Sequence, residues 1–317
     1  MWKYMTPDRC KELLLSFNLL NQNDFSKDIL NQLYSISNNV ENNYTIHKIK
    51  KRNGKVRTIY EPSYLLKKIQ RNILKNILDD INISDYAKAY KKGISLKDNA
   101  TPHVGKNIIL KLDIEHFFDS ISFFDVYNAC FPIELYPKNI GVLLTKLCTY
   151  YDFLPQGAPT SSYISNVVMR KFDEEIGQIT KELNIEYTRY SDDMTFSGDF
   201  DPKYIINIVK KKLNKMGLKL NYSKIRVISR CNRQYVTGVV VNVFAQTSSV
   251  YRKKIRQEIY FIKKYGLESH LRKINYNDSK SKYLYMLKGK INFVLNINSN
   301  DIEFINYKNY LNNYIII

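Results

Sequence analysis

Two adjacent aspartates, Asp192 and Asp193, are the residues of this chain best suited to chemistry. They end the tetrapeptide Tyr-Ser-Asp-Asp at 190–193, between two strand-like runs at 185–189 and 194–197. A tight hairpin turn usually carries Asn-Gly or Asp-Gly, because its backbone needs positive φ. Two carboxylates repel each other there and raise each other's proton affinity, so the pair makes most sense if divalent cations neutralise it. Alone, an Asp-Asp turn is usually a solvated loop, so the interpretation depends on what lies near it.

A third carboxylate, Asp113, ends a predicted buried strand over residues 108–113. Because both segments are predicted sheet elements, the three aspartates could meet on one edge of a sheet. Three convergent carboxylates suit a two-metal site, in which one ion activates an attacking hydroxyl and the other steadies a leaving pyrophosphate. Nucleotidyl transfer needs little more, since neutralisation and in-line positioning supply most of the barrier reduction in phosphoryl transfer.

Both helices and strands are predicted to surround these residues. Apolar residues at helical spacing predict two short helices within 8–38 and longer ones over 62–81, 122–131, 139–150, 161–181 and 202–216. Further strands are predicted at 44–50, 56–60, 218–220, 225–228 and 235–241. Asn53-Gly54 predicts a short hairpin with a basic tip, and Gly217 predicts a helix end. The central segment is therefore predicted to be α+β, with helices packed on an antiparallel sheet, followed from about residue 248 by a basic helical segment.

The charge of the chain indicates a polyanionic partner. It has 49 Lys and Arg against 30 Asp and Glu, a formal net charge of +19, and 44% apolar residues, enough to fill a core. Basic side chains that displace the counterions of nucleic acid gain affinity from their release, which makes nucleic acid the leading candidate. The alternative is an AT-rich genome, which inflates the Lys content without functional pressure.

The cysteines and the apolar runs exclude several classes of protein. Cys10, Cys130, Cys148 and Cys231 show no CxxC spacing, which argues against a zinc site or a disulfide framework, and we expect buried, reduced thiols. The sequence has no N-terminal leader pattern and no apolar run of about 18 residues. These patterns predict a cytoplasmic protein without a membrane partner.

Three segments in this order resemble motifs A, B and C of reverse transcriptases: Asp-Ile-Glu-His-Phe-Phe at 113–118, Leu-Pro-Gln-Gly-Ala-Pro at 154–159, and Tyr-Ser-Asp-Asp at 190–193. Asn-Ala-Thr-Pro-His at 99–103 and Val-Thr-Gly at 236–238 resemble signatures of bacterial retron reverse transcriptases. The similarity covers about residues 44–242. Motif C has Ser191 where many relatives have Ala, a change between small residues.

The resemblance implies a metal-binding catalytic triad of Asp113, Asp192 and Asp193, with the Ile114 carbonyl as an additional ligand. The implied cofactor is Mg²⁺ as two ions, with Mn²⁺ as a substitute. Glu115 is expected to be an exposed neighbour.

Nucleotide-binding roles follow from the same resemblance. Phe118 falls at the steric-gate position, where an aromatic ring crowds a ribose 2′-hydroxyl; the alternative is a core aromatic. Gln156 and Gly157 are expected to contact the incoming nucleotide and the template base, Gly allowing close backbone approach. Lys55 and Arg57 match residues that grip the triphosphate, although a solvated charged hairpin would explain them as well.

Lys224 follows Gly217 at the spacing of motif D, which implies a general acid that protonates the leaving pyrophosphate. The alternative is one more surface lysine. Asn99 and His103 are expected to hold structured RNA or to cap the strand before Asp113, and a lone His is more often structural.

Further RNA contacts are expected from the second signature and from the C-terminal segment. The first of these is the Val236-Thr237-Gly238 triplet. In the basic helix that starts near Tyr251, Arg252 and Lys253 suit a duplex backbone, although a solvated helix face explains them nearly as well.

These observations predict an α+β right-hand polymerase with an antiparallel-sheet palm, fingers and a helical C-terminal thumb. The predicted parts are a helical brace (1–43), fingers (44–107 with part of 130–160), a palm (108–247) and a thumb that binds RNA or duplex (248–317).

The predicted activity is that of an RNA-directed DNA polymerase, a nucleotidyltransferase that uses deoxynucleoside triphosphates. The resemblance implies a cognate retron noncoding RNA as template, priming from an RNA 2′-hydroxyl, and an RNA-linked multicopy single-stranded DNA product. It also implies antiphage (antiviral) defence with a separately encoded effector protein, since no effector domain is expected in this sequence. The alternatives are a reverse transcriptase of a group II intron or a diversity-generating element, and a noncatalytic RNA-binding scaffold.

Overall fold

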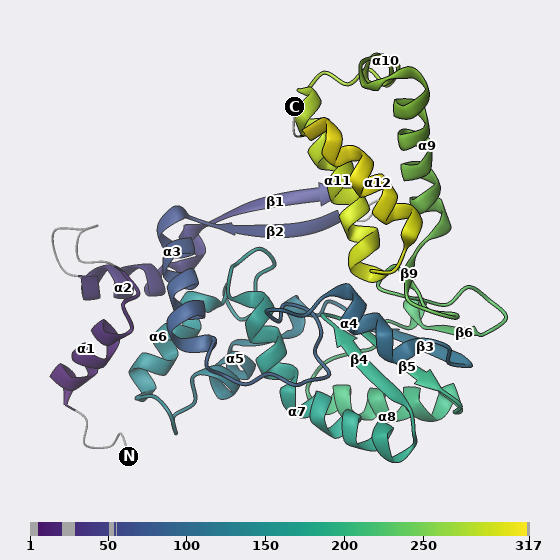
Figure 1. Cartoon of the computed structure of the whole chain (residues 1–317). Coiled ribbons are helices and arrows are strands. Elements are labelled where there is room, and N and C mark those ends of the chain that lie inside the picture. The colour runs from purple at the N-terminus through teal and green to yellow at the C-terminus, as the bar shows by residue number, and fades with distance from the viewer. Residues whose placement is uncertain (1–5, 21–28, 51–53, 55, 316–317) are drawn as a thin grey trace.

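The computed structural model describes residues 6–20, 29–50, 54 and 56–315. The chain begins with the two predicted short helices, α1 (Pro7–Ser16) and α2 (Ile29–Asn38). Buried Leu14 and Leu33 join the main hydrophobic core. Figure 1 shows both helices at the end of the molecule opposite the C-terminal helices.

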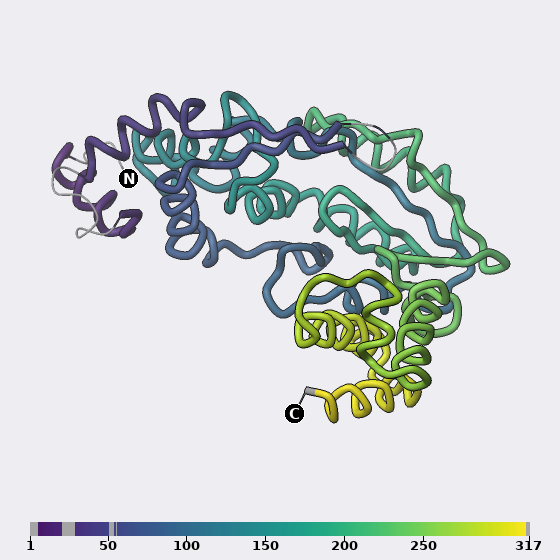
Figure 2. Tube along the Cα trace, turned by 90° about the horizontal axis from the view of Figure 1, so that it is seen from above, coloured from purple at the N-terminus to yellow at the C-terminus, as the bar shows by residue number. Residues whose placement is uncertain are grey.

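A long two-stranded ribbon follows, formed by β1 (Tyr44–Lys50) and β2 (Val56–Pro62), which pair antiparallel as predicted. Its side chains are mostly exposed, so the ribbon packs into the core only at its base. In Figure 1 the ribbon extends away from α3, and Figure 2 shows that it lies apart from the C-terminal helices. The predicted basic tip lies outside the described residues except for Gly54, and Lys55 is among the residues not described.

The helix after β2 is shorter and less regular than predicted. Helix α3 (Tyr64–Ile73) is capped by the Ser63 hydroxyl and continues as a π-helical turn over Leu74–Leu78. The apolar spacing that predicted a helix as far as Ile81 therefore overran its end. Buried Leu66 and Ile69 pack into the main core, which α5 (Phe123–Cys130), α6 (Lys138–Cys148) and α7 (Ser161–Glu182) also enter.

The predicted antiparallel sheet has four strands in the order β4-β5-β3-β6. They are β3 (Ile108–Asp113), β4 (Glu186–Tyr190), β5 (Asp193–Gly198) and β6 (Arg226–Ser229). Helices α7 and α8 (Pro202–Lys215) lie together below this sheet in Figure 1, and their apolar side chains share its core. The strand predicted at 218–220 is wrong, because this segment makes only an isolated bridge between Leu220 and Ile114.

A small three-stranded sheet of β7 (Tyr235–Val236), β8 (Val239–Val240) and β9 (Gln246–Thr247) follows. The single strand predicted at 235–241 is thus a tight hairpin, because Thr237 and Gly238 both have positive φ, 45° and 88°. Short helix α4 (Leu96–Ala100) packs on this sheet through Ala100.

The C-terminal segment is helical, as predicted, with α9 (Ser249–Tyr265), α10 (Leu267–Lys273), α11 (Lys280–Ile297) and α12 (Ile302–Ile315). These helices have a core of their own, which includes Ile259, Leu287 and Phe304. Figures 1 and 2 show them grouped apart from α1 and α2.

The cysteine prediction holds only in part. Cys130 and Cys148 are buried, whereas Cys10 is half-buried and Cys231 is exposed, so the prediction of a buried thiol is wrong for Cys231. Within the described parts of the chain, no helix combines the length and apolar character needed to cross a membrane.

Candidate active site

Strand pairing brings the three aspartates to one edge of the four-stranded sheet. Asp113, the last residue of β3, lies opposite Asp193, the first residue of β5. Tyr190 of β4 also pairs with Asp193, so Ser191 and Asp192 form the two-residue turn between β4 and β5. The Ile114 amide donates to the Asp192 carbonyl at 3.1 Å, which ties the turn to the end of β3. The convergence predicted from the sequence is therefore present in the backbone register.

The turn itself has an unusual backbone for its sequence. Ser191 is buried and has a φ of 60°. Hairpin turns usually place Gly where φ is positive, because a side chain there is strained. Strained residues persist where the surrounding structure over-determines them, and such residues gather at functional sites.

Two carboxylates at this edge, those of Asp192 and Asp193, have raised pKa values. Burial and the neighbouring Asp113 raise the pKa of Asp192 above its usual range. Burial also raises the pKa of Asp193 to about 6; Lys111 opposes the rise, and the other two aspartates add to it. The folded chain thus holds negative charges close together at neutral pH, an arrangement that a cation stabilises.

Lys224 is the cation that the structure places against Asp113. Its ammonium lies 2.8 and 2.7 Å from the two carboxylate oxygens. Asn221 supports the same residue, since its backbone amide donates to the Asp113 carbonyl at 2.8 Å and its side chain lies 3.3 Å from Oδ1. Partial burial lowers the pKa of Lys224, but pairing with Asp113 outweighs this and leaves the pKa above its ordinary value. Lys224 therefore belongs to the site and is not merely a surface lysine.

The donor set fits a hard divalent cation, because carboxylate oxygens are the ligands that Mg²⁺ prefers. In the parts of the chain that the structure describes, no three His, Cys, Asp or Glu side chains are yet arranged to hold a metal ion. In this structure the Lys224 ammonium donates to both oxygens of Asp113. The raised pKa values of Asp192 and Asp193 nevertheless show that this edge lacks positive charge, which a metal ion would supply. Glu115, as predicted, is an exposed neighbour.

The loop predicted to contact the nucleotide packs against the base of the ribbon. The Gln156 carbonyl accepts from the Tyr60 amide at 2.7 Å. A Cβ on Gly157 would lie 2.5 Å from the Tyr60 carbonyl oxygen, and Gly157 has a φ of 123°. Only glycine satisfies both conditions. The close backbone approach that the sequence predicted for Gly157 is thus made, in this structure, to β2.

Two further nucleotide-binding candidates lie near the aspartates. Arg57 is exposed on β2, and its charge helps to hold down the pKa of Asp192. Phe118 lies on the turn that follows β3, half-buried, with its ring 5.4 Å from that of Phe117 in an edge-to-face contact. Phe118 thus makes the core contact that the alternative interpretation predicted, and its steric-gate role stays a prediction.

The prediction that His103 contacts RNA is wrong for this structure. His103 is fully buried, with Nδ1 2.7 Å from the Ser197 hydroxyl and Nε2 2.9 Å from the Thr188 hydroxyl. Burial, with a smaller contribution from Lys106, lowers its pKa to about 3, so the ring is neutral. His103 joins β4 to β5 and so stabilises the hairpin that carries Asp192.

The two family-like signatures contact each other. Buried Asn99 donates from Nδ2 to the Thr237 hydroxyl at 3.1 Å. Val236 is also buried, so the side chains of Asn99 and Val236 cannot touch RNA here, and that part of the prediction is wrong. Thr237 is half-buried and Gly238 is exposed at the tip of the β7–β8 turn, where RNA could reach them.

The two basic candidates of α9 differ. Arg252 pairs with Asp301 and Glu303 and stacks over Phe304, with its guanidinium 4.7 Å from the ring centre. Its charge is therefore committed to holding α9 against α12, and the expected RNA contact is not the role this structure gives it. Lys253 is exposed and remains available.

Two residues of the site were not predicted from the sequence. Asn221 contacts Asp113, and the buried Arg189 donates from Nη1 to the Ser191 carbonyl at 3.0 Å. One signal was present. Arg189 is the last residue of the predicted strand 185–189, and a charged residue in a buried strand must have a partner.

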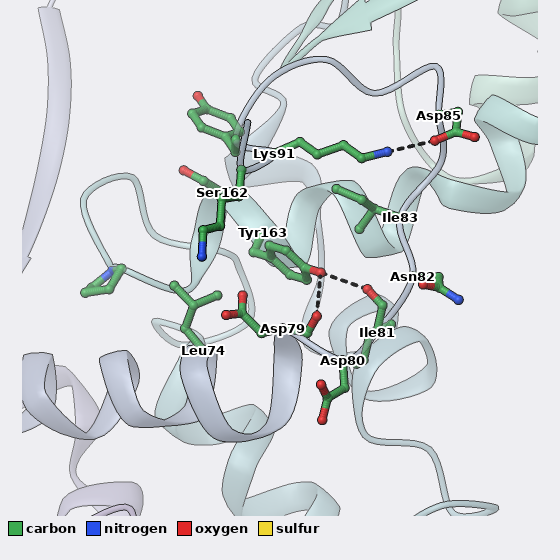
Figure 3. Close-up of a pocket in the computed structure, with 13 residues that line it drawn as sticks. Leu74, Asp79, Asp80, Ile81, Asn82, Ile83, Asp85, Lys91, Ser162 and Tyr163 are labelled. Carbon is green, nitrogen blue, oxygen red and sulfur yellow. Dashed lines mark hydrogen bonds and ion pairs between the residues drawn. The ribbon is translucent and has the colours of Figure 1, made fainter. Parts of the chain in front are cut away.

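A separate cavity of about 890 Å³ lies between the segment that follows α3 and the start of α7. Figure 3 shows Tyr163 reaching across it to Ile81, whose carbonyl accepts from the Tyr163 hydroxyl at 2.8 Å. Asp79, Asp80 and Asp85 also line this cavity, but Asp113, Asp192, Asp193 and Lys224 do not. The cavity is therefore separate from the candidate site.

Comparison with known proteins gives one consistent family. The family model for "Reverse transcriptase (RNA-dependent DNA polymerase)" matches residues 49–286. The Ec86 retron reverse transcriptase of Escherichia coli is 31% identical over 267 residues, covering 81% of this chain and 77% of its own length. The Mx65 retron reverse transcriptase of Myxococcus xanthus is 30% identical over 237 residues, covering 68% and 55%. Among solved structures, apo telomerase from Candida tropicalis aligns with a TM-score of 0.49 and 14% identity, covering 80% of this chain and 56% of that one.

Proposed function

Because this chain belongs to the retron reverse transcriptase family, whose members are RNA-directed DNA polymerases with a right-hand fold, we propose a specific reaction for it. The template is a cognate structured noncoding RNA, and a 2′-hydroxyl of that RNA is the primer. The product is multicopy single-stranded DNA joined to RNA. We further propose a role in antiphage defence in the bacterial cytoplasm, beside a separately encoded effector protein.

The observation that carries the catalytic part is the register of β3, β4 and β5. It sets Asp113 opposite Asp193 and puts Asp192 in the adjoining turn. We propose that these carboxylates, with the Ile114 carbonyl, hold two Mg²⁺ ions, which Mn²⁺ can replace. When bound, the metal supplies activation of the attacking hydroxyl and neutralisation of the leaving pyrophosphate.

The remaining site residues bind and orient the nucleotide in this proposal. Arg57 and Lys55, two residues before it in the sequence, hold the triphosphate. A guanidinium group suits bidentate phosphate contacts. Gln156 and Gly157 form the floor beneath the base. Phe118 crowds a ribose 2′-hydroxyl and so selects deoxynucleotides. Lys224 leaves Asp113 and gives its proton to the pyrophosphate as a general acid.

The domain assignment is part of the same proposal. Residues 1–43 brace residues 44–107, which with part of 130–160 form the fingers; residues 108–247 are the palm and residues 248–317 are the thumb. The formal charge of +19 supports binding of RNA and its DNA product. Exposed Gly238 and Lys253 and half-buried Thr237 are the predicted RNA contacts that remain accessible.

The test uses the purified full chain with the RNA encoded beside its gene, Mg²⁺ and deoxynucleoside triphosphates. We expect RNA-linked DNA, and we expect Asp192→Asn to lower its yield at least a thousandfold while RNA affinity stays unchanged. Glu115→Gln, on the exposed neighbour, is the matched control and should retain activity. Equal DNA from Asp192→Asn would refute the proposed site. DNA that is not joined to RNA would refute the priming step alone.

A further inference from the structure

A buried ion pair lies directly behind the turn that carries Asp192. Arg189 of β4 and Asp173 of α7 are both fully buried, with Nε and Nη2 of Arg189 2.8 and 2.6 Å from the two Asp173 oxygens. The Tyr187 hydroxyl donates to the same carboxylate at 2.8 Å. Asp173 thus accepts three hydrogen bonds, and the fork of Arg189 is fixed in one orientation.

The third arm of this guanidinium points at the turn. Nη1 of Arg189 donates to the Ser191 carbonyl at 3.0 Å. That carbonyl belongs to the peptide that joins Ser191, with its φ of 60°, to Asp192. A hydrogen bond there fixes the orientation of this peptide plane and therefore the direction in which the Asp192 side chain leaves the turn.

The frame behind Arg189 is rigid on both sides. Its backbone amide donates to the Tyr86 carbonyl, and its carbonyl accepts from the Lys88 amide, both at 2.8 Å. Helix α7 supports the segment 86–89, because the Asn166 side chain donates to the Ala89 carbonyl at 2.8 Å. Near its start, α7 is anchored through Tyr163 to the segment that follows α3 (Figure 3). The guanidinium therefore cannot shift unless α7 or β4 moves.

The pair is not needed merely to fill the core. A buried ion pair is often no more stabilising than apolar side chains of similar volume, because both charges lose their hydration. Among the side-chain hydrogen bonds of Arg189, the one to the Ser191 carbonyl reaches the turn, and no apolar side chain can replace it. Strained backbone, such as the positive φ of Ser191, persists where the surrounding structure over-determines it, and this bond is one such constraint.

We propose that Arg189, held in place by Asp173, is a positioning residue. It orients the Ser191–Asp192 peptide so that the Asp192 carboxylate faces Asp113. This inference rests on the proposed function. Arg189 acts through the turn and touches no substrate. Its removal should therefore impair metal binding and turnover more than nucleotide affinity.

The test compares two ways of removing the bond to Ser191. The triple variant Asp173→Leu, Tyr187→Phe, Arg189→Met removes both buried charges and the Tyr187 hydroxyl together, so no unpaired charge is left. The single variant Arg189→Lys keeps a charge for Asp173, but one ammonium cannot reach both Asp173 oxygens and the Ser191 carbonyl. Tyr187→Phe is the matched control, because it leaves the bond between Arg189 and Ser191 in place.

For the triple variant and for Arg189→Lys we expect kcat, per RNA-bound protein, to fall at least tenfold, while the KM for deoxynucleotides stays within threefold. The Mg²⁺ concentration that gives half of the Mg²⁺-induced rise in melting temperature, measured without substrates, should increase at least threefold. Misfolded protein alone would not move that midpoint.

Wild-type kcat and Mg²⁺ midpoint in a folded triple variant would overturn the positioning role. If the triple variant does not fold, the same result in Arg189→Lys overturns it. An inactive wild type would instead refute the proposed function, so the two failures are distinct.

Discussion

Lys224 donates from its ammonium to both carboxylate oxygens of Asp113, at 2.8 and 2.7 Å. The Asp113 side chain is 6% exposed and that of Lys224 is 55% exposed, so the ammonium can leave toward solvent while the carboxylate stays in place. In the proposed mechanism Lys224 neutralises Asp113, and Asp113 would be free to hold a metal ion once the ammonium has moved away. The Lys224 ammonium, the proposed proton donor, is thereby held at the site before the nucleotide and the metal bind.

Removal of this ammonium should tighten metal binding and slow turnover. In Lys224→Met no ammonium competes with a metal ion for the Asp113 oxygens, so we expect the Mg²⁺ concentration at half-maximal stabilisation to fall at least threefold. Loss of a general acid typically lowers a rate by about 10²- to 10⁴-fold, so kcat should fall at least tenfold. Mg²⁺ titrations of melting temperature and single-nucleotide extension measure the two effects.

The matched control is Lys219→Met, on an exposed lysine of the same segment. It changes the net charge equally, so a shift of the Mg²⁺ midpoint in both variants would show a general field effect and not competition at Asp113. A weaker Mg²⁺ midpoint in Lys224→Met would contradict the competition outright.

Phe118 predicts the sugar preference of the polymerase. A ring that excludes a 2′-hydroxyl sterically should lose that selectivity in order of side-chain size, through Phe118→Leu to Phe118→Ala. We expect the ratio of kcat/KM for deoxynucleotides over ribonucleotides to fall at least tenfold in Phe118→Ala, a loss of about 1.4 kcal/mol in discrimination. Phe124→Ala, on an exposed aromatic of α5, is the control. Unchanged discrimination would leave Phe118 with only its core contact to Phe117.

Gly157 predicts a local stability effect. In Gly157→Ala the new methyl group would lie 2.5 Å from the Tyr60 carbonyl oxygen at a φ of 123°, so both packing and backbone oppose it. We expect a loss of about 2 to 4 kcal/mol in unfolding free energy and a higher KM for deoxynucleotides. Gly93→Ala, with a φ of 79° and open space around it, should lose only about 1 kcal/mol. Equal losses would show that contact with Tyr60 is unimportant.

Local signals explain most of what the sequence predicted correctly. Ser122 caps α5 through its own hydroxyl, and Gly217 follows α8 with a φ of 72°. The edge aspartates were predictable because β4, the turn and β5 are contiguous and Asp113 ends a buried strand. The single strand predicted at 235–241 failed because local propensities conflict there. The valines flanking Thr237 and Gly238 favour a continuous strand, but these two residues form a turn.

Partners distant in sequence explain the rest. His103 bonds to Thr188 and Ser197, which lie 85 and 94 residues away, so nothing beside it in the sequence shows that it is buried. Likewise, Asn221 reaches Asp113 across 108 residues, and Asp173 reaches Arg189 across a helix end and a strand. Burial and pairing of polar groups depend on the assembled fold, which a single sequence pattern does not specify.

Buried His103 predicts that the protein loses stability in mild acid. Its pKa is about 3 when folded against 6.5 when unfolded, so between these values only the unfolded chain binds the proton, and unfolding free energy falls as pH falls. From pH 7 to pH 5 this amounts to about 2 kcal/mol. In His103→Gln the protein is less stable at every pH, but that part of the acid dependence should vanish. Urea titrations at both pH values measure the difference, and His116→Asn, on an exposed histidine, should keep the wild-type dependence. Identical pH dependence in His103→Gln and wild type would mean that His103 is protonated while the protein is folded.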